Sequence, residues 1–389
     1  ALAAAIRRGE LSPREAVLDA LERIERDPHN AFLSVRAEEA VAEADAASAG
    51  PLHGVPVGVK DVIDVAGAPT TAASRVLAGN VPSADAAVVE RLRRAGAVVV
   101  GKLNTHEFAF GASTTSAAYG PALNPWDPER ICGGSSGGSG AAVAAGLVPG
   151  ALGTDTAGSI RIPAAFCGVT GIRPSTGRVP NRGVVPVSWT YDTVGPLART
   201  AEDCALLLDA IAGHDPADAS TTRGAAEPCV DALAGGVEGM RIGVVDHLLG
   251  EVPLDPRIGA ACEDALDVLA GLGARVERVE AGFLRRAEGV QQLVMLPEAA
   301  EAHLPWLRTK LADYGADVRA RLLAGLLLPA SAPVTGQRAR RALAEQARPL
   351  LERFDVLAAP EMPIVAPRIG DDPVEVGGET MAYRLALIP

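Results

Sequence analysis

Short runs of apolar residues, separated by stretches with helical periodicity, constrain the fold of this chain more than any other feature. Residues 97–101 read Ala-Val-Val-Val-Gly, and a run of this length and composition is typical of a strand buried on both faces. Strands that alternate with helices indicate α/β layers around a sheet. The predicted strands are residues 55–65, 97–101, 151–154, 241–245, 275–279 and 354–359. The predicted helices are residues 12–26, 36–48, 85–95, 141–147 and 257–272.

Prolines indicate where helices begin or break in two helical regions. Ser12, Pro13 and Glu15 have the pattern of a capping box with proline at the first helical position, so a helix is expected to begin there. Residues 283–353 are predicted to be mostly helical. Breaks in that region are expected at its prolines, which are Pro297, Pro305, Pro329 and Pro333.

The charge and the cysteines of the chain exclude several kinds of partner. The formal net charge is −12, whereas nucleic acids and anionic membranes both attract basic surfaces. No apolar run approaches the ~20 residues that span a bilayer. The five cysteines are odd in number and form no C-x-x-C pair, which indicates reduced thiols in a cytoplasmic protein. We therefore expect no direct nucleic-acid contact, no membrane contact and no metal site.

Lysine is rare in this chain, and its rarity draws attention to the lysines that are present. Of the 36 basic residues only Lys60, Lys102 and Lys310 are lysine. A buried lysine can lose its proton, whereas arginine keeps its own. Lys60 lies in the apolar context Val-Gly-Val-Lys, and lowering its pKa from about 10.4 to about 7 costs roughly 4–5 kcal/mol, which burial can impose. We expect the carboxylate of Asp61 to point away from Lys60, because successive strand residues face opposite sides. Chance retention explains Lys310, which stands in a charged helical segment.

A Gly/Ser loop at residues 132–140 admits three interpretations. A flexible linker is disfavoured because the flanks are apolar and rich in alanine. The loop could also bind an anion at the N-terminus of a helix, but it lacks the Lys-Ser/Thr of a nucleotide-binding loop, so nucleotide binding is disfavoured. Residues 134–138 also fit the G-x-S-x-G of a nucleophile elbow, but no strand precedes them and no histidine in a catalytic context follows.

A second serine, Ser159, closes a tight turn of small residues at 153–159. Such a turn leaves consecutive backbone N–H groups free, and these groups can form an oxyanion hole beside the hydroxyl. The alternative is a plain β-turn in which the serine bonds to its own backbone. A nucleophilic serine needs a base, and none of the six histidines has an aspartate partner at motif spacing. Lys60 is the remaining candidate.

The two serine segments together resemble the signature of the amidase-signature family, whose members are serine amidohydrolases. The resemblance covers most of residues 1–250 and, more weakly, the rest of the chain. It is carried by residues 133–140, 153–155 and 158–164, and it extends to residues 52–61, 101–109 and 192–200.

The family uses a Ser–cis-Ser–Lys catalytic unit, and its residues can be transferred by motif position. The resemblance implies Ser159 as nucleophile, Ser135 as the bridging cis-peptide serine and Lys60 as base. It also assigns the oxyanion hole to the backbone N–H groups of Thr156, Ala157, Gly158 and Ser159. Arg161 is expected to brace the turn, and Lys102 to be structural. No residue is assigned to substrate binding, and no cofactor is expected.

The resemblance also implies an architecture. It predicts a single large α/β domain with a mixed, mostly parallel central β-sheet covered on both faces by helices. This domain is expected to span residues 1–389, with core motifs at 52–200 and a more variable, substrate-side region at about 283–350. The final Leu387-Ile388-Pro389 is no natural terminus, so the C-terminal end is expected to be truncated.

The function that we expect from the resemblance is hydrolysis of a small carboxamide or urea-like amide through an acyl-enzyme. The expected partners are a small-molecule amide substrate and a second copy in a homodimer. One alternative is the A subunit of a tRNA-dependent glutamine amidotransferase. Such subunits usually read Asp-Gln-Ile-Gly-Pro where this chain has Asp-Thr-Val-Gly-Pro at 192–196. They also usually carry a tyrosine after the Gly-Arg-Val stretch, where this chain has Pro-Asn-Arg at 180–182. These differences favour a stand-alone enzyme. A second alternative, a catalytically silent binding protein, is disfavoured because all three catalytic positions are retained.

Overall fold

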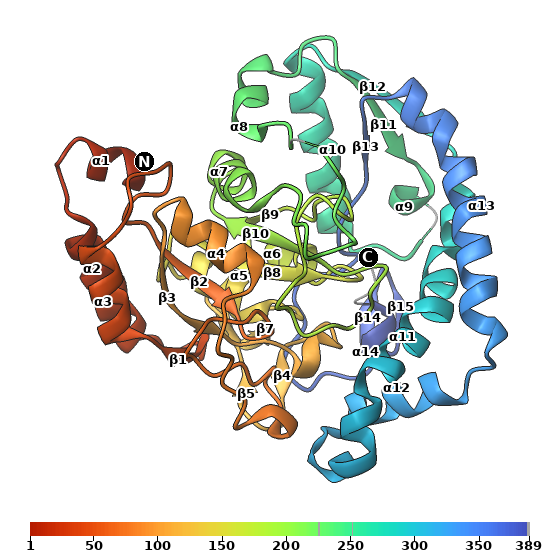
Figure 1. The fold of residues 1–389 in the computed structure, drawn as a ribbon. Helices are drawn as coiled ribbons and strands as arrows, with labels where there is room; N and C mark the ends of the chain where they lie inside the picture. Colours follow the sequence, from red (N-terminus) through yellow and green to blue (C-terminus); the bar gives the residue numbers. More distant parts are fainter. Residues whose placement is uncertain (225, 251, 387–389) are drawn as a thin grey trace. The chain divides into compact units, whose positions relative to one another are not determined.

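The computed structural model describes residues 1–224, 226–250 and 252–386 (Figure 1). The chain divides into two compact units, and each is described by itself. The first unit is Ala1–Ala232 with Ala302–Ala320, and the second is Leu233–Glu301 with Arg321–Pro389. Whether residues 1–389 act as one domain stays a prediction.

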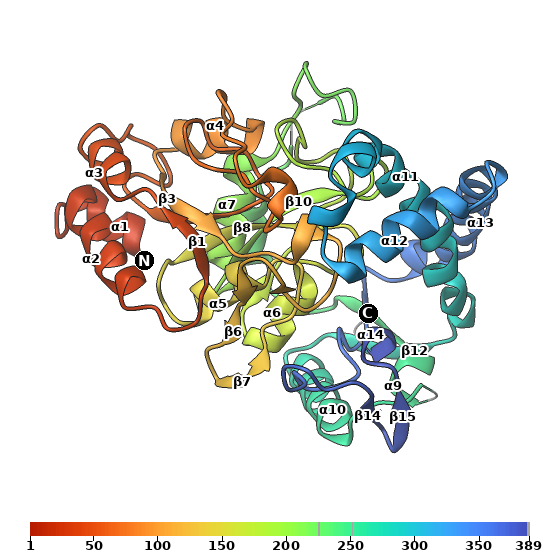
Figure 2. The same ribbon diagram turned by 90° about the horizontal axis from the view of Figure 1, so that it is seen from below.

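A six-stranded mixed sheet forms the centre of the first unit (Figures 1 and 2). β3, β2 and β8 are parallel neighbours, and antiparallel pairing joins β1 to β3, β10 to β8 and β9 to β10. Four strands therefore run in one direction, namely β3, β2, β8 and β9. In sheet order the strands are β1 (Phe32–Val35), β3 (Val98–Leu103), β2 (Pro56–Lys60), β8 (Gly150–Asp155), β10 (Thr193–Ala198) and β9 (Thr170–Gly171).

Helices cover both faces of this sheet, and two glycines of β8 show how closely they approach. A Cβ on Gly150 would meet Leu207 of α7, and a Cβ on Gly153 would meet Ser136 beside α5. Because these glycines are three residues apart in one strand, they face opposite sides. α4 lies with α7 on one side (Figure 2), whereas α2, α3, α5 and α6 share a hydrophobic core with β3. The predicted α/β fold is confirmed. The six helices are α2 (Pro13–Glu25), α3 (Ala37–Asp45), α4 (Ala87–Arg94), α5 (Gly137–Ala144), α6 (Arg161–Cys167) and α7 (Ala201–Ile211).

α5 explains why the Gly/Ser loop is no linker. The helix begins at Gly137, four residues before the predicted start, and its first seven residues are buried. A Cβ on Gly138 would come within 2.5 Å of the backbone of Asn104 and within 2.6 Å of the carbonyl of Ala31. Close packing therefore requires glycine at position 138.

The capping box at the start of α2 is present as predicted. Ser12 Oγ accepts a hydrogen bond from Glu15 N at 3.1 Å, and Glu15 Oε2 accepts one from Ser12 N at 2.8 Å. Ser12→Ala is expected to lower the free energy of unfolding by about 1 kcal/mol. Urea denaturation measures this loss, with the exposed Ser83→Ala as the control. Equal stability of Ser12→Ala and Ser83→Ala would contradict a capping role for Ser12.

The remaining elements of the first unit are short. They are α1 (Leu2–Arg7), α8 (Cys229–Ala232), the 3-10 turns Arg75–Leu77, Glu107–Ala109 and Leu311–Asp313, and two hairpins, β4 (Thr115–Ser116) with β5 (Gly120–Pro121) and β6 (Leu123–Asn124) with β7 (Asp127–Ile131). All five cysteines of the chain are unpaired.

The second unit is built around a parallel three-stranded sheet in the order β12-β11-β13. Its strands are β12 (Arg275–Val279), β11 (Arg241–Val245) and β13 (Val356–Ala358), and a hairpin pairs β14 (Val374–Val376) with β15 (Glu379–Met381). Its helical segments are α9 (His247–Gly250), α10 (Pro256–Gly271), α13 (Ser331–Arg353), α14 (Tyr383–Ala386) and the 3-10 turns Leu233–Gly235 and Gly282–Arg286. α11 (Ala287–Thr309) and α12 (Ala316–Leu327) each have residues in both units.

Three of the four predicted proline breaks are wrong. α11 continues through Pro297 and Pro305, and α13 begins at Ser331, so that Pro333 lies in its first turn. A first-turn proline costs nothing, because that N–H has no partner inside the helix. Near Pro297 the helix is held by close packing: Cβ atoms on Gly325 and Gly336 would contact Leu296 and Val294. Only Pro329 falls between helices.

Candidate active site

The three predicted catalytic residues lie on the first unit, at and beside the ends of two neighbouring strands. Lys60 is the last residue of β2 and is fully buried. Its Nζ lies 2.7 Å from Ser135 Oγ and 2.8 Å from Thr154 Oγ1, and Thr154 belongs to the adjacent strand β8. The structure therefore brings the predicted base into direct contact with the predicted relay serine.

Ser135 is held by its backbone in the loop before α5. The Gly134–Ser135 peptide bond is cis, as the resemblance implies. The carbonyl of Ser135 accepts hydrogen bonds from His106 N at 3.0 Å and from Thr114 Oγ1 at 3.1 Å. Gly134 has no room for a side chain, because a Cβ would come within 2.7 Å of Ser113 N. These contacts fix the hydroxyl of Ser135 beside Lys60.

Ser159 lies in the turn that follows β8, and its residue is 8% exposed. Its carbonyl accepts a hydrogen bond from Ser136 N at 3.1 Å, which ties the turn to the segment that carries Ser135. Gly158 has a φ of +115°, a conformation that favours glycine. The two predicted serines therefore lie on segments that are bonded to each other, and the role of each stays a prediction.

One of the predicted oxyanion-hole donors, the N–H of Gly158, is already hydrogen-bonded to a side chain. The N–H of Gly158 donates to Asp155 Oδ1 at 2.7 Å, because the carboxylate of Asp155 folds under the turn. Sequence reasoning assumed that every N–H of the turn was free. The N–H groups of Thr156, Ala157 and Ser159 keep this assignment as a prediction.

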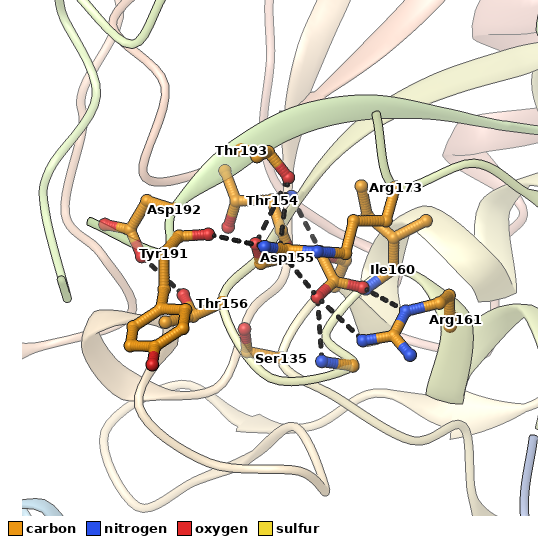
Figure 3. A network of polar contacts seen from close by, with 12 residues as sticks. Ser135, Thr154, Asp155, Thr156, Ile160, Arg161, Arg173, Tyr191, Asp192 and Thr193 are labelled. Carbon is orange, nitrogen blue, oxygen red and sulfur yellow. Dashed lines mark hydrogen bonds and ion pairs between the residues drawn. The ribbon is translucent and has the colours of Figure 1, made fainter. Parts of the chain in front are cut away.

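Asp155 is the centre of a charged network beneath the turn (Figure 3). Its fully buried carboxylate accepts hydrogen bonds from Ile160 N and Arg161 Nε, each at 3.1 Å, and from Arg173 Nη1 at 3.2 Å. Burial would raise the pKa of Asp155, but the charges of Arg161 and Arg173 outweigh burial and hold that pKa below its usual value. Arg161 thus braces the turn, as expected.

A second buried carboxylate, Asp192, contacts the turn from the other side. Thr156 Oγ1 donates to Asp192 Oδ1 at 2.5 Å. Asp192 Oδ2 accepts from the N–H groups of Val187 and Ser188 at 2.8 and 3.0 Å. Burial is the main cause that raises the pKa of Asp192, and these hydrogen bonds oppose it. Asp192 therefore fixes the start of the turn against the segment 187–188.

Burial lowers the pKa of Lys60 to about 7, while the charges of Asp155 and Asp192 act in the opposite direction. Asp61 takes no part in this balance. Its carboxylate accepts from Lys102 Nζ and from Thr71 N, each at 3.0 Å, on the side away from Lys60. Lys102 is fully buried in this ion pair, and burial is the main cause that lowers its pKa.

Sequence reasoning missed Thr154, Arg173 and the contacts of Asp192. Thr154 reaches Lys60 because β2 and β8 pair in parallel with Val59 opposite Leu152. That register is a long-range property that no local motif contains. A polar residue at the end of the predicted strand 151–154 is the local signal in the sequence that could have pointed to Thr154.

No three or more His, Cys, Asp and Glu side chains among residues 1–224, 226–250 and 252–386 are grouped so that they could hold a metal ion. In the same part of the chain, no helix has the length and apolar character needed to cross a membrane.

Comparison with known proteins gives a consistent set of relatives. Residues 15–389 match the family model described as Amidase. The A subunit of the glutamyl-tRNA(Gln) amidotransferase of Chromohalobacter salexigens is 39% identical, and the match covers 100% of this chain and 87% of the relative. A solved amidase structure is 35% identical with a TM-score of 0.89, covering 100% of this chain and 87% of that one. The solved A subunit of the glutamyl-tRNA(Gln) amidotransferase of Thermotoga maritima is 34% identical with a TM-score of 0.79, covering 92% and 78%.

These relatives overturn the expected function and the expected partners. The prediction of a stand-alone amidohydrolase is wrong, because curated relatives about 40% identical over the full chain are named as A subunits of an amidotransferase. Subunits of an amidotransferase have protein partners, so the prediction that the partners are only a small-molecule substrate and a second copy is also wrong. Sequence reasoning gave too much weight to two local differences, at Thr193 and Pro180, against similarity along the whole chain.

Proposed function

The chain belongs to the amidase family, and on that premise we propose that it is the glutamine-hydrolysing A subunit of a tRNA-dependent amidotransferase. As a family member it is a hydrolase that acts on amide C–N bonds. The observation that carries the proposal is the full-length similarity to A subunits, joined to a buried Lys60 in contact with Ser135. Its unpaired cysteines suit a cytoplasmic location.

In the proposed mechanism Ser159 is the nucleophile, and its proton passes through Ser135 to Lys60. Neutral Lys60 has one lone pair and two N–H bonds. The lone pair accepts the O–H of Ser135, while one N–H donates to Thr154 Oγ1. Thr154 thereby directs the lone pair toward the relay.

Attack on the side-chain carbonyl of glutamine forms a tetrahedral intermediate with a negative oxygen. Backbone N–H groups of the turn, at Ala157 and Ser159, would stabilise this oxygen. The proton on Lys60 returns through Ser135 to the leaving nitrogen, so that ammonia departs and an acyl-enzyme remains. Water then attacks the ester and releases glutamate, which restores Ser159.

The carboxylates around the turn support this assignment. Asp155 and Asp192 bond to the backbone at Gly158 and to the side chain of Thr156, so they hold the turn from two sides. A turn held in this way needs no reorganisation when charge develops, which is the general source of electrostatic catalysis. The ammonia that is released would pass to a partner protein of the complex, with glutamyl-tRNA as the acceptor, as the names of the relatives suggest.

The experiment that tests this function measures ammonia release from glutamine by the full chain, alone and with the other subunits of the amidotransferase. We expect hydrolysis to rise on addition of those subunits and glutamyl-tRNA. The matched control is the same assembly with Ser159→Ala, which should release no ammonia above background. Failure to hydrolyse glutamine in the complete assembly would refute the proposed substrate.

A further inference from the structure

Arg173 makes more contacts beneath the nucleophile turn than a simple ion pair requires (Figure 3). Its Nη1 contacts both the carbonyl and Oδ1 of Asp155, and it lies 3.3 Å from Thr193 Oγ1. Its Nη2 donates to the carbonyl of Tyr191 at 2.9 Å. The side chain is 23% exposed, against 34% for Arg161, the other cation on Asp155. Arg173 is therefore the better shielded of the two positive charges.

The charges that face Lys60 come from few elements. β8 ends in Asp155, and Asp192 stands directly before β10. Asp155 directly follows Thr154, whose Oγ1 lies 2.8 Å from Lys60 Nζ, and both carboxylates favour the protonated amine of Lys60. On β3, Lys102 is paired with Asp61, and α5 has no charged residue. The positive charges paired with Asp155 are those of Arg161 and Arg173.

We propose that Arg173 is a positioning residue whose guanidinium offsets the charge of Asp155, so that the amine of Lys60 stays neutral and available as a base. The inference rests on the proposed role of Lys60. A buried Asp155 without its cations would place an uncompensated negative charge near Lys60 and bind a proton there. Arginine suits this task, because it keeps its charge at every relevant pH.

If Arg173 had only a structural role, its loss would change the pH dependence of the rate in a different way. Loss of the hydrogen bonds to Asp155, Thr193 and Tyr191 would loosen the turn and lower the maximal rate. It would not move the pH at which the rate reaches half its maximum. The charge and the hydrogen bonds can be separated, because Arg173→Gln removes the charge but keeps donors, whereas Arg173→Lys keeps the charge.

The test follows inactivation of the full chain by a sulfonyl fluoride, which forms a covalent bond with an activated serine, between pH 5 and 10. For the wild type, the rate should rise as Lys60 loses its proton, with a midpoint near pH 7. Arg173→Gln removes a charge that repels the proton, so the midpoint should move upward by about one pH unit, with about fivefold slower labelling at pH 7. Arg173→Lys should keep the wild-type midpoint. Equal midpoints in wild type and Arg173→Gln would overturn the inference.

A second measurement is independent of catalysis. The chain has only three lysines, so selective 13C labelling of lysine gives NMR signals that single Lys→Arg variants at 102 and 310 can assign. The titration midpoint of Lys60 should rise in Arg173→Gln. If Arg173→Gln does not fold, Arg161→Gln removes the other cation on Asp155, and the titration midpoint of Lys60 should rise in that variant as well. A wild type that resists labelling would count against the proposed function. A labelled wild type with an unmoved Lys60 titration in the variant would reject only the role of Arg173.

Discussion

Ser159→Ala is expected to lower hydrolysis by about 10⁴-fold or more, because it removes the atom that forms the acyl-enzyme. The fold should not change. Alanine fits in place of a serine that is only 8% exposed, and the bond from Ser136 N to the Ser159 carbonyl belongs to the backbone. Ammonia release measures the first effect, and a cooperative thermal unfolding curve checks the second.

Ser139→Ala is a matched control for this variant. Ser139 belongs to the Gly/Ser segment that carries Ser135, and its hydroxyl donates to the carbonyl of Leu152 at 3.0 Å. We expect the Ser139→Ala protein to keep most of its activity. Turnover by Ser159→Ala near the wild-type level would remove Ser159 from the mechanism.

Lys60→Arg should lose about 10³-fold in rate, a loss similar to that of Lys60→Met, because loss of a general base costs about 10²–10⁴-fold. Arginine retains its proton, so it cannot accept one from Ser135. The buried site beside Ser135 and Thr154 also leaves little room for a guanidinium. Steady-state hydrolysis at pH 8 measures both variants.

Lys310→Arg provides the lysine-to-arginine control, because Lys310 is exposed and donates only to the carbonyl of Val76 among its described contacts. The Lys310→Arg protein should hydrolyse its substrate at the wild-type rate. The wild-type rate should rise with pH through about 7, as burial sets the pKa of Lys60 there. An active Lys60→Arg variant, or a wild-type rate that is flat from about pH 6 to 9, would contradict the base role.

Much of the site could be predicted because its residues stand in contiguous, unusual segments. Ser135 and Ser159 lie in runs of small residues, and Lys60 is conspicuous in a chain that otherwise prefers arginine. The α/β fold followed from apolar runs of strand length. These signals are local, so the sequence displays them directly.

The rest depends on long-range pairing or on side-chain packing. Thr154 meets Lys60 only through the register of two strands, and Gly158 loses its free N–H only because Asp155 folds beneath the turn. Pro297 lies within a helix that the neighbouring helices α12 and α13 approach closely at Leu296 and Val294. None of these causes can be read from the residues next to the position they affect.

Because of the parallel pairing of β2 with β8, enzymatic activity also reports whether these two strands have paired correctly. A slip of one residue in this pairing would turn Lys60 toward the opposite face of the sheet and separate it from Thr154. A refolded sample could then recover its circular dichroism and its compact size yet remain inert. Specific activity after refolding thus counts the molecules in which these two strands have found their native alignment.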